Sequence, residues 1–263
     1  MLARFFGKLG HEILYFLETT GRMGVFLFTC LLCLVTPPYR IRAIIRQTYF
    51  IGARSSFVII FTGLFTGMVL GLQGYYTLRK FGAEGLLGSA VAVSLLRELG
   101  PVLTALMVIG RAGSAMCAEI GIMRNSEQID ALETMAIDPY RFVMVPKFGA
   151  TILSLPFLTF IFNMVGIMGG YLVGVSLLGL TSGAYFQGMY QNVVWDDIEM
   201  GLVKSFVFAL IVVWVAASKG YHLHLERSGG FGAEGVSRTT TSAVVMSSVL
   251  VLVWDYLISA MML

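Results

Sequence analysis

Uncharged runs alternate with charged clusters along the whole chain, and this alternation predicts the membrane-spanning elements. Ser55–Leu78 and Phe148–Trp195 contain no charged residue, and Thr239–Leu263 contains only Asp255. A helix needs about 20 apolar residues to cross the hydrocarbon core of a bilayer. The pattern therefore predicts an all-α integral membrane protein with five transmembrane helices, at about 55–77, 86–110, 148–175, 200–219 and 240–262.

The first 50 residues have a different pattern, in which basic residues are mixed with aromatic ones. The apolar run Val25–Val35 has eleven residues, too few for a span, and Thr36-Pro37-Pro38 follows it. Helices of such composition lie in the membrane interface. We therefore expect an interfacial amphipathic helix within 1–50 and a single transmembrane domain in 51–263. Whether residues 25–35 also dip into the bilayer stays open at this point.

Composition and charge placement agree with a polytopic membrane protein and exclude a soluble domain. Charged residues make up 13% of the chain, against about 25% in soluble domains. Fourteen lysines and arginines fall before the first, third and fifth predicted spans, whereas the other loops hold only Arg79 and Lys80. Basic loops stay in the cytoplasm, so we expect a cytoplasmic N-terminus and an external C-terminus. This topology accounts for the net charge of +3, which gives no indication of nucleic acid binding.

Small residues recur at helical spacing in the first predicted span. Gly63, Gly67 and Gly71 are four residues apart and lie on one face of a helix. Glycines at this spacing let two helices approach closely. We expect this face to pack against another helix, either of the same chain or of a second copy.

Arg97 and Glu98 are the only charged residues between Gly85 and Gly110, in the middle of the second predicted span. A charge near the bilayer centre costs about 2.5–3.5 kcal/mol on insertion scales and usually marks a functional site. Neighbouring side chains on a helix diverge by about 100°, so the two cannot pair with each other. Each therefore needs a separate partner.

Lys204 is the only other basic residue in the interior of a predicted span, and a Glu98–Lys204 contact would leave Arg97 free. The planar guanidinium group suits two-pronged recognition of a phosphate. We interpret the three residues as a lipid-headgroup site, whereas the competing interpretation is that they only hold helices together. An apolar lining for acyl chains is expected from Leu70, Leu72, Tyr75, Tyr76 and Leu99.

The most polar stretch of the chain lies between the second and third predicted spans. Asn125 and Gln128 have the spacing of a capping box, Ser126 is an alternative cap, and Asp138-Pro139 ends the helix. A helix of about twelve residues, 126–137, results, with acidic groups on one face and apolar groups on the other. Its acidic face suits a protein partner, although a solvated connecting helix is the alternative.

Several ordered motifs run through these elements and on to the last span. They are Leu96-Arg97-Glu98-Leu99-Gly100-Pro101, Gly110-Arg111-Ala112-Gly113, Glu119-Ile120-Gly121-Ile122-Met123-Arg124, Glu127-Gln128-Ile129-Asp130-Ala131-Leu132, Met135, Asp138-Pro139, Gly232-Ala233-Glu234-Gly235-Val236 and Thr239-Thr240-Thr241-Ser242-Ala243-Val244-Val245. In this order they resemble the signature of the MlaE permease family. The resemblance covers nearly the whole chain and is weakest in the first 50 residues.

The resemblance implies an ABC-type phospholipid transporter in the inner membrane of a Gram-negative bacterium. Two permease copies would form a homodimer, with lipid bound between them, and pair with two cytoplasmic ATPases that use ATP with magnesium. A periplasmic ring of MCE domains would cover the outer face, and a STAS-domain protein would bind the ATPase. The ATPase would contact the helix 126–137 through Glu127, Asp130, Ala131, Leu132, Met135, Asp138 and Pro139.

The chain lacks a phosphate-binding loop of the type G-x-x-x-x-G-K-[ST], so we expect a transport subunit that binds no cofactor and is not an enzyme. His222 and His224 have no third ligand nearby, so we expect no metal site. One competing hypothesis is an ion- or proton-coupled secondary carrier with Glu98 and Lys204 as a relay. Five spans without an inverted repeat disfavour it. A membrane scaffold would leave the intramembrane charges unexplained.

Overall fold

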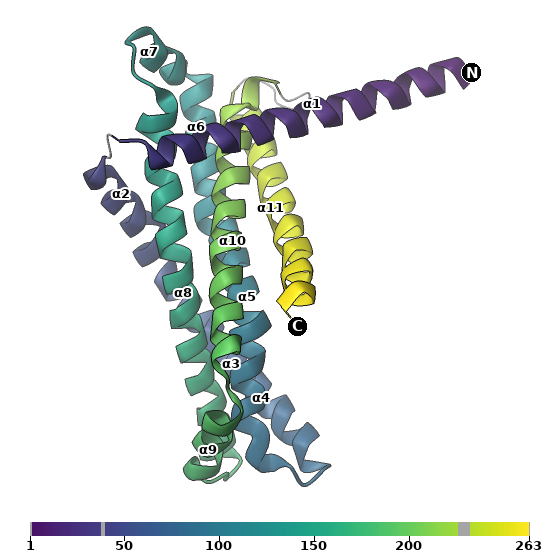
Figure 1. Cartoon of the computed structure of the whole chain (residues 1–263), viewed down its shortest axis with the longest axis vertical. Coiled ribbons are helices and arrows are strands. Elements are labelled where there is room, and N and C mark those ends of the chain that lie inside the picture. Colours follow the sequence, from purple (N-terminus) through teal and green to yellow (C-terminus); the bar gives the residue numbers. More distant parts are fainter. Residues whose placement is uncertain (1, 38–39, 226–231, 263) are drawn as a thin grey trace.

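Long helices build the whole of the described structure. The computed structural model describes residues 2–37, 40–225 and 232–262, and these contain helices and turns without strands. Helices α2 to α11 form an elongated bundle, and α1 (Leu2–Val35) lies across one end of it (Figure 1). The prediction of an all-α integral membrane protein is therefore confirmed.

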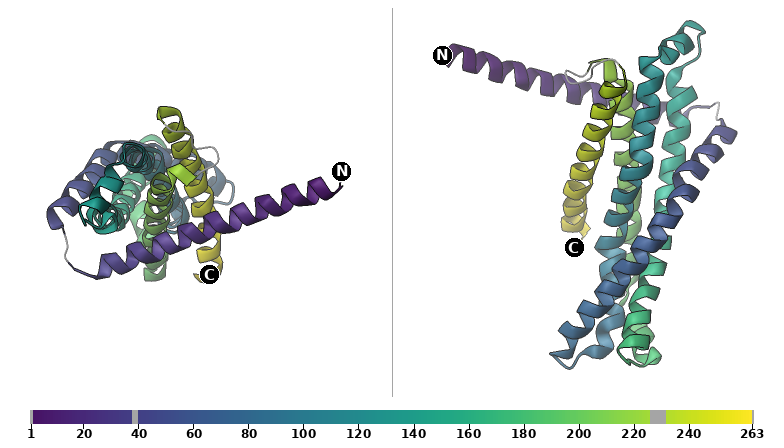
Figure 2. Two further views of the ribbon diagram at one scale, coloured as in Figure 1. Left: turned by 90° about the horizontal axis from the view of Figure 1, so that it is seen from above. Right: turned by 180° about the vertical axis from the view of Figure 1, so that it is seen from behind.

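Six segments are long and apolar enough to cross a membrane. They are Leu17–Val35, Ile41–Arg79, Glu84–Asn125, Tyr140–Leu177, Trp195–Tyr221 and Ala233–Met262. The last five contain the five predicted spans and run along the bundle. The first belongs to α1, which crosses the bundle in each view instead of joining it (Figure 2). Leu17–Val35 has 19 residues, so the expectation that the apolar run is too short for a span was wrong, and the interfacial position of this helix stays a prediction.

The first bundle segment consists of α2 (Ile41–Thr48), a π-helical turn (Tyr49–Ala53) and α3 (Arg54–Arg79). After the second segment, the short helix α7 (Gln128–Thr134) forms one extreme of the molecule, and a π-helical turn, Tyr140–Met144, leads into α8 (Val145–Tyr171). At the opposite end lies α9 (Ser182–Asn192), which precedes α10 (Trp195–Tyr221) and α11 (Ala233–Met262).

The second bundle segment is longer than the predicted span 86–110. It contains α4 (Leu87–Ser94), α5 (Gly100–Val108) and α6 (Ser114–Asn125), joined without a break by two π-helical turns, Leu95–Leu99 and Ile109–Gly113. Pro101 follows the first of these turns and has no N–H to donate four residues back, which favours a wider turn. There, the N–H of Gly100 bonds to the carbonyl of Leu95, five residues back.

The glycine face of α3 packs against α8 of the same chain. A side chain at Gly67 would overlap the carbonyl oxygen of Gly166, and Cβ atoms at Gly63 and Gly71 would lie 3.0 Å from backbone atoms of α8. Backbone contact at this distance needs residues without side chains, as small-residue helix pairs in membranes show. The face that Gly63, Gly67 and Gly71 form thus lies against a helix of the same chain.

Large apolar side chains also cover the outside of the bundle. Phe57, Phe65 and Phe157 expose between 57% and 70% of their surface. Soluble proteins rarely expose contiguous apolar surface on this scale, whereas lipid-facing helices do. Across one end, α1 is anchored to the bundle by the Trp214 indole, which donates a hydrogen bond of 2.8 Å to the Met23 carbonyl. The protein is a multi-pass membrane protein.

Candidate functional site

Arg97 and Glu98 lie within the π-helical turn Leu95–Leu99, and their side chains diverge as expected. Glu98 reaches Lys204 on α10, and Arg97 reaches Asp197 at the start of the same helix. A π-helical turn inserted in an α-helix often marks a functional position. Both intramembrane charges thus lie in the first of the two π-helical turns that interrupt the α-helical hydrogen-bond pattern of the second segment.

Glu98 belongs to a network that ties three bundle segments together. The Lys204 Nζ lies 2.6 Å from Glu98 Oε2 and 2.8 Å from Asp255 Oδ1 on α11. The Ser259 hydroxyl donates a hydrogen bond of 3.0 Å to Glu98 Oε1. Lys204 is fully buried, whereas the Glu98 side chain is 41% exposed. The expected Glu98–Lys204 contact is present, and one face of Glu98 remains open to a ligand.

The expectation that Arg97 stays free was wrong. Its Nε donates a hydrogen bond to Asp197 Oδ1, and Asp197 is almost fully buried. The second carboxylate oxygen, Asp197 Oδ2, accepts a hydrogen bond of 2.9 Å from the Val194 N–H at the start of α10. Even so, 34% of the Arg97 side chain stays exposed. A ligand must therefore share this guanidinium group with a fixed carboxylate.

Only some of the residues predicted to form the apolar lining pack inside the chain. Leu70 and Leu99 are half-buried and pack against the main core, whereas Tyr76 is 54% exposed and contacts the ring of Tyr75. Among the described residues, Tyr76 makes no hydrogen bond or ring contact with the charged network, so its place in a lipid site stays a prediction.

Sequence reasoning missed three polar partners in the site: Asp197, Asp255 and Ser259. Asp255 is the only charged residue of the last predicted span, so the same argument that selected Arg97 and Glu98 would have selected it. Asp197 lies beside other acidic and aromatic residues just before the fourth span. Because such residues are typical of the membrane interface, no sequence signal placed Asp197 in the site. Ser259 carries no signal of this kind.

A second candidate site is the α7 region, whose helix is shorter than predicted. The helix spans Gln128–Thr134 instead of 126–137, and neither Asn125 nor Ser126 is its N-cap. Ser126 donates its hydroxyl hydrogen to the Ile122 carbonyl, and Asn125 accepts from the Gly232 N–H. Glu127 takes the N-cap position with a left-handed φ of 56°.

The C-terminal boundary of α7 also differs from the prediction. Ala136 has a left-handed φ of 58°, which ends the helix before Asp138-Pro139 is reached. Asp138 instead starts the next helical turn, because its Oδ1 accepts a hydrogen bond of 2.9 Å from the Tyr140 N–H. The helix is thus bounded by two residues in backbone conformations that L-residues adopt infrequently.

The predicted coupling residues divide into an exposed and a buried group. Leu132 and Pro139 are buried, and Leu132 packs with Ile129 into a core that includes Phe26 and Phe148. These two cannot form a contact surface, so the expectation that they do was wrong. The other predicted coupling residues are exposed, namely Glu127, Asp130, Ala131, Met135 and Asp138.

Arg124 connects α7 to the end of α10. Its Nη1 lies 2.6 Å from Asp130 Oδ1, its Nε bonds to His224 Nδ1 at 3.2 Å, and its guanidinium group lies over the Tyr221 ring. Asp130 is thus partly neutralised before any partner binds. The continuous helix Glu84–Asn125 ends beside this cluster, so one rod joins the α7 region to the charged network.

The bundle, its lipid-facing surface and its buried ion pairs define an integral membrane protein with charged groups inside the bundle. The Permease MlaE family profile matches residues 44–261. The chain is 43% identical over 263 residues to the intermembrane phospholipid transport system permease protein MlaE of Haemophilus influenzae, covering 100% of this chain and 98% of that protein.

Two further relatives extend the comparison. Over 259 residues the chain is 41% identical to a probable ABC transporter permease protein of Rickettsia conorii, with 98% of each chain covered. It is also 33% identical over 219 residues to the chloroplastic protein TRIGALACTOSYLDIACYLGLYCEROL 1 of Arabidopsis thaliana, covering 83% of this chain and 61% of that protein. The chain belongs to the MlaE permease family and is a permease subunit of the ABC transporter type.

Proposed function

We propose that the chain moves phospholipids as the permease of an ATP-driven transporter in the inner membrane of a Gram-negative bacterium. Two copies would enclose a lipid cavity, and a separate ATPase would use ATP with magnesium at the cytoplasmic end. An MCE-domain ring would exchange lipid at the periplasmic end, and a STAS-domain protein would bind the ATPase. The full-length similarity to the Haemophilus phospholipid permease supports this proposal, and the N-terminus is then cytoplasmic and the C-terminus periplasmic.

The continuous helix Glu84–Asn125 would transmit movement from the ATPase end to the charged network. Glu98 and Asn125 are 27 residues apart, which corresponds to about 40 Å of helix at 1.5 Å per residue. Such a rod transmits a displacement of α7 to the charged network without unfolding. The two π-helical turns on the way are the positions where the rod bends most readily. ATP-driven movement at α7 would thereby change the geometry around Glu98.

The charges of the network favour a particular kind of headgroup. Two basic side chains, Arg97 and Lys204, face three acidic ones, Glu98, Asp197 and Asp255, so the formal charge is −1. A purely anionic headgroup would meet the surplus carboxylate. A headgroup with both a phosphate and an ammonium group can place the phosphate at Arg97 and the ammonium at Glu98. Phosphatidylethanolamine has this combination, and we expect it to bind before phosphatidylglycerol.

Transport by the reconstituted complex tests this function. In proteoliposomes that contain the chain and its ATPase, Glu98→Gln should lower phospholipid transport roughly tenfold or more, because it removes a charge-assisted contact. Glu84→Gln is the matched control, since Glu84 begins the same helical segment and pairs with Arg79 at the surface. Equal transport by both variants would show that Glu98 is not in the lipid site. Transport driven by a pH gradient without ATP would support the secondary-carrier alternative instead.

A further inference from the structure

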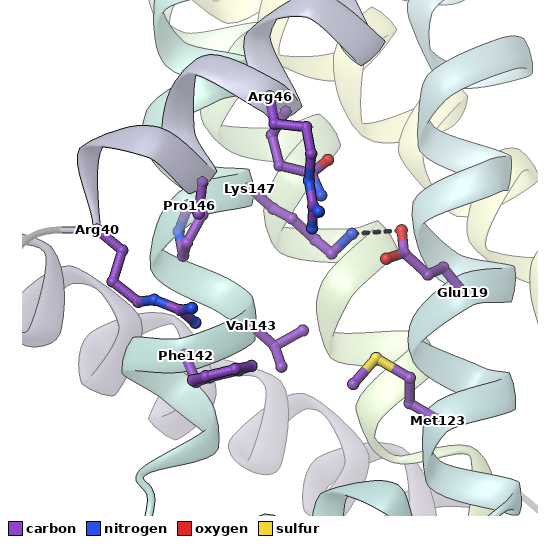
Figure 3. Close-up of a pocket in the computed structure, with 10 residues that line it drawn as sticks. Arg40, Arg46, Glu119, Met123, Phe142, Val143, Pro146 and Lys147 are labelled. Carbon is purple, nitrogen blue, oxygen red and sulfur yellow. Dashed lines mark hydrogen bonds and ion pairs between the residues drawn. The ribbon is translucent and has the colours of Figure 1, made fainter.

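A pocket separate from the charged network lies beside α2 (Figure 3), at the end of the bundle that α1 crosses in Figure 1. It has a volume of about 170 Å³, more than ten times the roughly 10–15 Å³ that one water needs. Three elements line it: the start and inner face of α2, the middle of α6, and the turn that leads into α8. Their lining residues include Arg40, Arg46, Gln47, Glu119, Phe142 and Lys147.

The pocket has a surplus of positive charge. Lys147 is the most deeply buried of its cations, and its Nζ lies 2.5 Å from Glu119 Oε2 (Figure 3). Arg46 reaches down from α2 toward this pair, and Arg40 lies over the Phe142 ring at 3.8 Å. Within the described part of the chain, the ion pairs leave Arg40 and Arg46 without a carboxylate partner. Three cations and one anion give the pocket a formal charge of +2.

A neutral donor complements these cations. The Gln47 Oε1 is buried and has no hydrogen-bond partner within the described residues, although Gln47 lines the pocket. A half turn of the amide brings its NH₂ group to the same position, where it can donate to an anion. A second hollow of about 310 Å³ shares Arg46, Gln47 and Glu119 with the first and adds Arg54. Together the two hollows form a basic groove along α2.

The opposite face of α2 is apolar and exposed, which indicates that the pocket lies beside the membrane, where anionic lipid headgroups are available. Ile41, Ile45 and Tyr49 are between 61% and 65% exposed and recur every four residues, and Phe57 and Phe61 continue the stripe along α3. Tyr49 and Phe61 are twelve residues apart, or about 18 Å of helix, close to half of the roughly 30 Å hydrocarbon core. This segment therefore carries a phosphate-sized basic pocket on its inner side and meets the acyl chains of one leaflet with its outer side.

We propose that the pocket lined by Arg40, Arg46, Gln47 and Lys147 binds the phosphate of an anionic phospholipid of the cytoplasmic leaflet. Basic pockets between membrane helices at this depth bind anionic headgroups. The formal charge of +2 favours a lipid of net negative charge over a zwitterionic one. This preference is the opposite of the one proposed for the charged network, so the two sites are separable by headgroup.

Spin-labelled lipid in nanodiscs tests the proposal on the full chain. The matrix is phosphatidylcholine, and the probe is spin-labelled phosphatidylglycerol, whose motionally restricted fraction reports binding. Each arginine near an anionic headgroup contributes about fivefold in affinity, so Arg46→Gln should weaken binding about fivefold and the Arg40→Gln/Arg46→Gln variant about thirtyfold. Arg46→Lys keeps the charge and should stay close to the unaltered protein. Circular dichroism checks that each variant is folded, which the exposure of both arginines leads us to expect.

Arg42→Gln is the matched control, because Arg42 is an exposed arginine of the same helix that does not line the pocket. If Arg42→Gln weakens binding as much as Arg46→Gln, the attraction is a general surface effect and the proposal fails. Excess inorganic phosphate at constant ionic strength distinguishes the source of the phosphate group. Failure of phosphate to displace the lipid supports a lipid site, whereas full displacement would assign the pocket to a soluble anion and overturn the lipid assignment.

Discussion

Replacing Lys204 by methionine should destabilise the folded protein more than any other single change in the charged network. Methionine keeps most of the side-chain length but removes the cation that lies 2.6 Å from Glu98 and 2.8 Å from Asp255. The two carboxylates then face each other at no more than about 5.4 Å, the sum of these distances. Lys204 is fully buried, so water cannot replace the missing charge at that position.

The size of the effect follows from the geometry. Two like charges at about 5.4 Å repel by about 3 kcal/mol at an effective dielectric constant of about 20. Removal of one partner from a buried ion pair costs about 3–5 kcal/mol in general. We therefore expect Lys204→Met to lower the free energy of unfolding by about 3–5 kcal/mol. Asp255→Asn should cost about 1 kcal/mol or less, because it leaves the Lys204–Glu98 pair intact and removes the surplus negative charge.

Unfolding of the purified protein in mixed detergent micelles, followed by circular dichroism, measures these differences. The Lys204→Met/Asp255→Asn double variant should recover about 3 kcal/mol relative to Lys204→Met, since the repulsion is removed with the second carboxylate. Equal stability of Lys204→Met and Lys204→Met/Asp255→Asn would refute the expected repulsion between Glu98 and Asp255. So would a loss for Asp255→Asn as large as the loss for Lys204→Met.

Three further changes test the packing, the α7 connection and the pH response. Gly67→Ala should cost about 1–3 kcal/mol of stability, because its Cβ would overlap the Gly166 carbonyl oxygen and force α3 away from α8. Arg124→Gln removes the contact with Asp130 and should lower the lipid moved per ATP hydrolysed while the ATPase still binds. Burial lowers the pKa of His222 below its ordinary value of 6.5, so the unfolded chain binds more protons just below that pH. Stability should therefore be complete above pH 6.5 and fall as the pH is lowered, less steeply in His222→Asn.

Each of these expectations has its own control. Gly24→Ala serves for Gly67→Ala, because a Cβ at Gly24 meets no atom within 4 Å, and an equal loss in both variants would contradict the packing argument. An unchanged ratio of lipid transport to ATP hydrolysis in Arg124→Gln would remove this residue from the coupling path. His222 lies near Arg22, Arg124 and His224. If His222→Asn leaves the pH dependence of thermal unfolding unchanged, another group is responsible for it.

The positions of the helices could be predicted from the sequence because bilayer thickness imposes a simple rule on apolar runs. The same rule cannot find where a helix continues beyond the membrane. The second segment extends to Asn125 because Arg111, Glu119 and Arg124 are good helix formers, and a charged residue ends an apolar run without ending a helix. Capping patterns failed for α7 for a related reason. Asn125 is already engaged with the chain before α11, a contact that no local pattern contains.

The charged network could be predicted only in part. The angle between Arg97 and Glu98 follows from helix geometry alone, and it correctly required two separate partners. The choice of partners depends on which helices meet. Arg97 pairs with a residue 100 positions away at the start of α10, and Glu98 also contacts Ser259, 161 positions away. Pairings over such separations follow from the three-dimensional arrangement of α10 and α11 rather than from the local sequence.

The close packing of α3 and α8 limits how two copies of the chain can associate. The small-residue faces of α3 and α8 contact each other within one copy, where Gly63, Gly67 and Gly71 meet Phe162, Gly166 and Gly170. They are therefore hidden from any second copy. In the proposed dimer, contact would then rely on bulky side chains that remain outside, as on α11, whose most apolar stretch is only 17% buried. An interface of that kind is held by side-chain packing and tolerates small changes in the spacing between helices, as the proposed lipid cavity between two copies would require.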